Sequence, residues 1–229
     1  MPPVKPQKPL AAETVPTVGS TVRSLMVESI FTNLKPTFLP QGKVDDLVTR
    51  RLIIWAFYKC EDRSSLTVTK SVEKVIGFIL TKAKKIFSIL VYISLKGASL
   101  YGLLRYLIEW ELHDIHLPFR REQIDALFPY ITDQDVEDIK GMRLDREAWN
   151  DDHVNHFAEN QWKFCAPVFS TCIDNHDIVE KSILPFIYKN SDSVAAGAFG
   201  EVMKYKIHDS HLDTSGLVSD IALKKYLEK

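Results

Sequence analysis

The chain has 229 residues, of which 45% are hydrophobic and 26% are charged, and its formal net charge is −1. This length allows one or two domains, and the balanced charge argues against nucleic acid or a membrane surface as the main partner. The three cysteines are widely spaced and odd in number, which argues against a disulfide framework and favours an intracellular, cytoplasmic or nuclear protein. Cys165 and Cys172 lack the partners of a zinc site, so we expect buried free thiols.

Residues 1–20 are rich in proline and have no apolar segment, so we expect a disordered leader without a secretory signal. Residues 21–165 carry the three- and four-residue steps of helices and predict a helical domain. The expected helices lie at 21–34, 44–58, 97–110, 120–128, 132–139 and 151–160.

The longest apolar stripe runs from Val72 to Ile93 and predicts the helix around which the core is built. Its segment 86–95 is bounded by lysines and is about half of the roughly 20 residues that a spanning helix needs, so we expect a buried helix rather than an anchor. Four lysines fall off the stripe, and this pattern favours a solvated face over an anion-binding role. These lysines are Lys70, Lys74, Lys82 and Lys85.

Residues 161–169 are aromatic and apolar, and we place a linker at 166–182. Near the end of the chain, residues 194–202 read V-A-A-G-A-F-G-E-V and residues 221–225 read I-A-L-K-K. These two segments resemble the glycine-rich loop and the V-A-I-K strand that open a protein kinase domain. More loosely, the order of a helical region, Q-W-x-F-x-A-P-V-F and I-L-P-F resembles the N-terminal part of fungal kinase-domain proteins.

The predicted fold is therefore mainly α, with a helical domain followed at 183–229 by an incomplete antiparallel β unit. This unit resembles the first three strands of a kinase N-lobe. The resemblance implies ATP as the cofactor and serine or threonine hydroxyls of proteins as the substrate. It also implies a set of nucleotide-contacting residues: Ala195, Gly197, Ala198, Phe199, Gly200, Val202, Ala222 and Lys224.

In such a site, glycines let the backbone approach the phosphates, and the lysine contacts the α- and β-phosphates. Phe199 would shield the phosphates, while Val202 and Ala222 would pack on the adenine. Ala195 departs from the pattern, because it stands where G-x-G-x-x-G has its first glycine.

The chain ends shortly after Lys224, without H-R-D or D-F-G, so we expect no catalytic residue, no magnesium ligand and no phosphorylation by this chain alone. Magnesium would be expected only in a full-length kinase. An alternative stays open: a helical interaction or regulatory module with a vestigial kinase segment. A glycine-containing hairpin beside an unrelated basic strand is the simplest structural alternative.

Other polar groups give weaker signals. His113 and His116 lack the H-E-x-x-H spacing of a zinc site, so we expect surface histidines. His208 and His211 fall where a kinase joins its second and third strands, and we expect a solvated insert. The acidic residues of 133–138 lack the glycine and terminal glutamate of a calcium loop.

Overall fold

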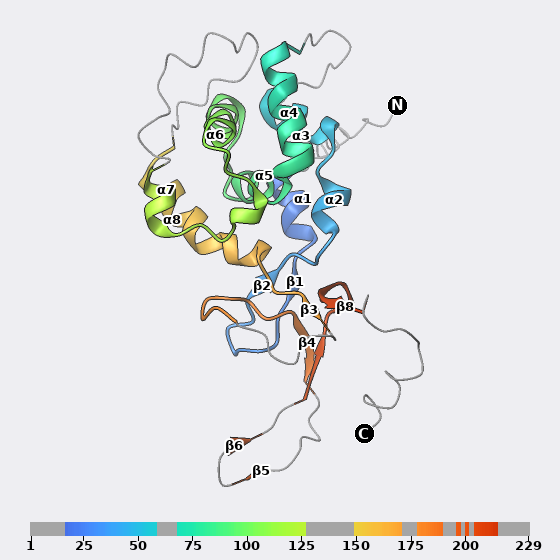
Figure 1. Ribbon diagram of the computed structural model, residues 1–229. Helices are drawn as coiled ribbons and strands as arrows, with labels where there is room; N and C mark the ends of the chain where they lie inside the picture. The colour runs from blue at the N-terminus through green and yellow to red at the C-terminus, as the bar shows by residue number, and fades with distance from the viewer. Residues whose placement is uncertain are drawn as a thin grey trace, which may run out of the picture.

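The computed structural model describes residues 17–58, 68–126, 149–170, 178–189, 196–197, 200–201 and 204–214. This part of the chain is mainly helical, as the sequence predicts. The helices gather at one end of the molecule and the strand pairs lie at the other, with β5 and β6 farthest from the helices (Figure 1).

The helices are α1 (Val18–Ser24), α2 (Lys43–Leu47), α3 (Arg50–Tyr58), α4 (Lys70–Lys82), α5 (Lys84–Tyr92), α6 (Gly97–Glu109), α7 (Arg121–Ala126) and α8 (Asp151–Asn160). Single 3₁₀ turns are η1 (Asp114–His116), η4 (Gln161–Phe164) and η5 (Asp209–His211). The strands are β1 (Val27–Glu28), β2 (Thr37–Phe38), β3 (Phe169–Ser170), β4 (Phe186–Lys189), β5 (Ala196–Gly197), β6 (Gly200–Glu201), β7 (Tyr205–Ile207) and β8 (Leu212–Asp213).

Helix α5 is the centre of the core. Its residues 86–91 are all buried, and it contacts α1, α2, α4, α6 and α8. The prediction of a buried helix in this segment is therefore confirmed. In the described ranges, no helix combines the length and the apolarity that crossing a bilayer requires.

The single helix predicted from Val72 to Ile93 is wrong, because α4 ends at Lys82 and α5 begins at Lys84. Ala83 between them has φ −136° and ψ 32°, outside the helical region, and it is fully buried. A break of one residue barely shifts the phase of the apolar stripe, so periodicity could not reveal it.

Two further helix predictions are wrong in their bounds. The helix expected at 21–34 ends at Ser24, and the chain then forms the antiparallel β1–β2 pair. The reason is tertiary: the buried hydroxyl of Ser29 donates to the carbonyl of Leu184 at 2.6 Å, and the N–H of Ile30 donates to the carbonyl of Phe186 at 2.8 Å. The helix expected at 44–58 divides into α2 and α3.

Helices α6, α7 and α8 match the predictions at 97–110, 120–128 and 151–160. Asn150 is the N-cap of α8, because its side chain accepts the N–H of His153 at 3.0 Å. The helix expected at 132–139 and residues 1–16 of the expected leader lie outside the described residues. The end of the leader, expected at residue 20, is wrong, because α1 already begins at Val18 with Thr17 as its N-cap.

The β segments follow two patterns. β4 pairs with β7 and β5 pairs with β6, both antiparallel, as an antiparallel unit requires. β3 instead pairs with β8 in parallel, and this returns the chain after β7 to residues 169–170, inside the range predicted as a linker. Contacts from residues 27–30 to residues 184–186 also join the helical and β regions.

Gly19 lets α1 lie against α5. A Cβ at this position would be only 2.6 Å from the carbonyl oxygen of Val91. We expect Gly19→Ala to lower the free energy of unfolding by about 1–3 kcal/mol, since backbone must move to admit the methyl group. Equilibrium urea unfolding measures the change.

The matched control is Gly77→Ala in the interior of α4, where the added Cβ would meet no atom within 4 Å. There the same substitution should raise the free energy of unfolding by about 0.5–1 kcal/mol, because alanine is the better helix former. Equal effects of the two substitutions would show that α1 does not approach α5 closely.

Candidate functional site

The glycine segment forms a tight hairpin. Ala196 pairs with Glu201 and Gly197 pairs with Gly200, antiparallel. Because the two glycines are direct partners, only two residues connect them, which is the shortest common hairpin connection. Neither glycine has a Cβ, so the backbone at the base of this turn is open to close approach by another group.

The structure therefore brings Gly197 and Gly200 together as strand partners. The other residues of the predicted nucleotide site lie outside the described residues: Ala195, Ala198, Phe199, Val202, Ala222 and Lys224. Their placement, and that of the lysine above all, stays a prediction.

The β4–β7 pair lies on either side of the glycine hairpin in the sequence. Tyr188 pairs with Lys206 and Lys189 pairs with Tyr205, and the register shifts by a bulge between Phe186 and Tyr188. Together the two pairs follow the order of one long, interrupted hairpin, β4–β5–β6–β7.

Aromatic rings hold the base of this hairpin. Phe186 stacks on Tyr205 with ring centroids 5.0 Å apart, and Phe31 meets Phe186 edge-on at 5.5 Å. Phe169 of β3 lies 6.0 Å from Phe186 on a nearly parallel plane. Residues from β3, from β7 and from the segment after β1 thus converge on a single ring of β4.

His211 joins the segment after the hairpin to two distant parts of the chain. It is 1% exposed. Its Nε2 accepts the backbone N–H of Gln41 at 3.0 Å, and its Nδ1 lies 3.0 Å from the carbonyl oxygen of Pro167. The ring of Phe38 packs edge-on against it at 5.2 Å.

These two partners fix the protonation of the ring. A backbone N–H can only donate and a carbonyl can only accept, so Nε2 must be bare and Nδ1 must carry the proton. The contacts of His211 with Gln41 and Pro167 therefore require the neutral Nδ1–H tautomer. Burial is the largest influence and lowers the pKa of His211, the backbone hydrogen bonds to Pro167 and Leu39 oppose this shift, and Coulombic interactions with His208 and Lys85 lower the pKa further.

The expectation of a solvated insert at His208 and His211 is wrong for His211. The segment is polar, and its burial comes from Gln41 and Pro167, which are 170 and 44 residues away in the sequence. A local pattern carries no signal of such partners, although a histidine pair directly after a predicted strand was the available cue.

A hollow lies at the corner between α4 and α5. It has a volume of about 570 Å³ and is bounded by the loop 39–45, by the end of α4, by the start of α5 and by residues 113–115. Lys82, Lys84, Lys85 and His113 contribute to its wall. We call it the corner groove. The sequence analysis missed it because the break at Ala83 creates it.

Metal chemistry finds no support among the described residues, where no three potential ligands from His, Cys, Asp and Glu come together. His113 and His116 lie 4.5 Å apart ring to ring, with His116 exposed, as expected of surface histidines. Cys165 is a free, half-buried thiol, and burial raises its pKa to about 11. Cys172 lies outside the described residues.

Comparisons with protein-family models, with curated proteins and with solved structures gave no match to this chain. The function is therefore argued from the residues and their geometry.

The neutral state of His211 predicts acid sensitivity. Its pKa is lowered in the folded chain, so below the ordinary histidine value of about 6.5 the unfolded chain binds more protons. The stability contributed by His211 is complete above that pH, and it falls as the pH drops from about 6.5 to the folded pKa. Urea unfolding between pH 8 and pH 5 measures it.

The variant His211→Gln should cost about 1–3 kcal/mol at pH 8, because it disturbs two buried hydrogen bonds, and less at pH 5. The exposed His116 provides the control, since His116→Gln should leave the pH dependence as in the parent chain. An unchanged pH dependence in His211→Gln would show that His211 is not kept neutral.

Proposed function

We propose that this chain is a member of the protein kinase family and that its glycine hairpin is the phosphate-facing loop of an ATP site. The observation that supports it best is the direct pairing of Gly197 with Gly200 in a tight antiparallel hairpin. The sequence order supports it too, because I-A-L-K-K follows the hairpin as the lysine strand follows the loop in kinases.

The chemistry of the proposed site divides among few groups. The glycines let backbone N–H groups approach the phosphate oxygens, and Lys224 supplies positive charge to the α- and β-phosphates. Val202 and Ala222 would bound the adenine, and Phe199 would cover the phosphates. Ala195 makes the start of the loop stiffer than a glycine would.

The proposal assigns nucleotide binding to this chain and no phosphoryl transfer. A kinase takes its base from the H-R-D motif and its magnesium ligands from D-F-G and the catalytic loop, and this sequence holds neither motif. Serine or threonine side chains of proteins are the substrate that the family relationship implies.

The arrangement of the β segments is consistent with this role. The hairpin stands at the end of a two-stranded arm that points away from the helices (Figure 1). The arm is fixed at its base by the Ile30–Phe186 hydrogen bond and by the N–H of His208, which donates to the carbonyl of Pro185 at 2.8 Å.

One observation favours the alternative function. The helical region has a large core of its own, which among the described residues reaches from Val18 to Phe164. A helical interaction or regulatory module could therefore fold and act whether or not the hairpin binds nucleotide.

Thermal unfolding with ATP and magnesium separates the two functions. We expect 5 mM MgATP to raise the melting temperature, because a ligand present at ten times its Kd adds about 1.4 kcal/mol to the folded state. The increase should be lost in Lys224→Met and kept in Lys225→Met, which removes the same charge one residue further on.

If 5 mM MgATP leaves the melting temperature unchanged while the chain still unfolds cooperatively, the kinase proposal is wrong and the helical module remains. Equal loss in the two lysine variants would also contradict it, because the effect would then be general charge attraction.

A further inference from the structure

The corner groove offers a second place where a ligand could bind. Its walls come from four separate segments: the loop 39–45, the α4–α5 corner, residues 113–115 and Phe164. The loop turns at Gly42, whose φ of +84° is open to glycine and strained for other residues. Its volume of about 570 Å³ exceeds that of a single water site many times over.

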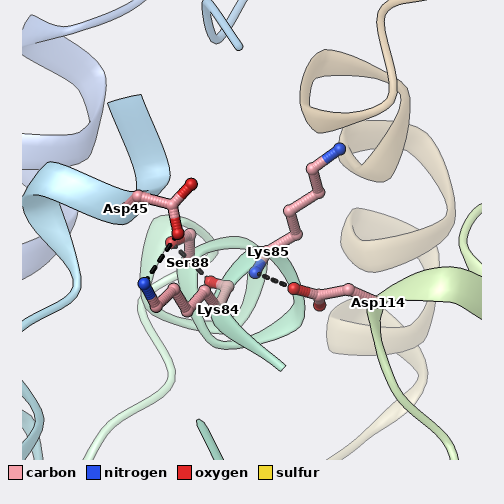
Figure 2. Close-up of polar contacts among 5 residues, drawn as sticks. All are labelled: Asp45, Lys84, Lys85, Ser88 and Asp114. Atoms are coloured by element: carbon pink, nitrogen blue, oxygen red, sulfur yellow. Dashed lines mark hydrogen bonds and ion pairs between the residues drawn. The ribbon is translucent and has the colours of Figure 1, made fainter. Parts of the chain in front are cut away.

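Both carboxylates in the groove wall are already engaged. Asp45 accepts the ammonium of Lys84 at 2.6 Å. Asp114 accepts the backbone N–H groups of Lys85 and Ile86 at 2.8 and 2.9 Å, at the first turn of α5 (Figure 2). The charge of Asp45 is therefore paired with that of Lys84, whereas Asp114 holds two neutral backbone N–H groups and keeps its negative charge.

The other two lysines of the groove wall are Lys82 and Lys85. In the described part of the chain, neither ammonium has a hydrogen bond or an ion pair. Figure 2 shows Lys84 turned toward Asp45, whereas Lys85 extends to the other side of the corner. The charge of Lys85 acts on Asp114, Cys165 and His211, so its ammonium lies within Coulombic reach of all three. His113 adds an imidazole to the same wall.

We propose that the corner groove binds a phosphorylated small molecule, with Lys82, Lys85 and His113 as its contacts to the phosphate group. The geometry favours an anion over a metal ion, since Lys82, Lys84, Lys85 and His113 outnumber the two carboxylates of the wall, and both carboxylates already bind other groups of the protein. A concave wall also focuses the field of its charges, so lysines in it attract an anion more strongly than lysines on a convex face.

The sequence pattern alone favours a solvated face for these lysines. The structure distinguishes among them: Lys70 and Lys74 are exposed on α4 outside the groove wall, whereas Lys82 and Lys85 line it. This division provides a matched comparison in which equal charge is removed from either place.

Inorganic pyrophosphate is the probe, titrated into the full chain and followed by isothermal titration calorimetry at low and at moderate salt. We expect saturable binding at one site. Binding should weaken by about tenfold in Lys82→Gln/Lys85→Gln, which removes two charge-assisted contacts. It should stay within about twofold of the parent chain in Lys70→Gln/Lys74→Gln, apart from weak long-range screening effects.

Equal loss in the two double variants, or no saturable binding to the parent chain, overturns the proposal. Lys82→Gln alone guards against misfolding, because this exposed residue can change without disturbing the core and should still weaken binding. Lys224→Met keeps the corner groove separate from the proposed ATP site, since pyrophosphate binding at the groove should survive in it. Binding lost only in Lys224→Met would place the anion at the hairpin instead and overturn the proposal.

Discussion

The hydrogen bonds of Asp114 to the first turn of α5 are the contact on which the helical region depends. The first N–H groups of a helix have no partner within that helix, and those of α5 lie partly buried beside the core. Asp114 accepts two of them, and although burial raises its pKa, these two bonds oppose that increase. With its start secured, α5 can be buried along residues 86–91 and serve as the surface on which α1, α2, α6 and α8 pack.

Sequence periodicity predicted where several helices lie, but it did not predict the residues at which some of them begin and end. It found α6 and α8, and it predicted a buried helix segment at 86–95, of which residues 86–91 lie buried in α5. It could not find the break at Ala83, because the carboxylate that makes the break tolerable comes from residue 114. It also extended the first helix too far, since the partners that hold residues 27–30 in extended structure are at 36–38, 184 and 186.

For the candidate site the division is similar. The motif G-A-F-G predicted a hairpin, and the pairing of Gly197 with Gly200 agrees with a hairpin, whatever its ligand. The contacts that attach the segment after the hairpin to the rest of the protein could not be predicted from the sequence, because His211 hydrogen-bonds to Gln41 and Pro167, which are far from it along the chain. The corner groove was beyond it for the same reason: its cations are adjacent in the sequence, but the segments facing them are not.

The two regions of interest share one segment of backbone. Residues 39–42 form a wall of the corner groove, and the N–H of Gln41 in that wall holds His211. Burial is the main cause of the lowered pKa of His211, and the positive charge of Lys85 adds the smallest of the contributions in the same direction. An anion beside Lys85 would offset that charge, so His211 would accept a proton more readily. By the reciprocity of linked equilibria, protonation of His211 would in turn favour the anion. Binding of the proposed anion and protonation of His211 would therefore be linked through Lys85.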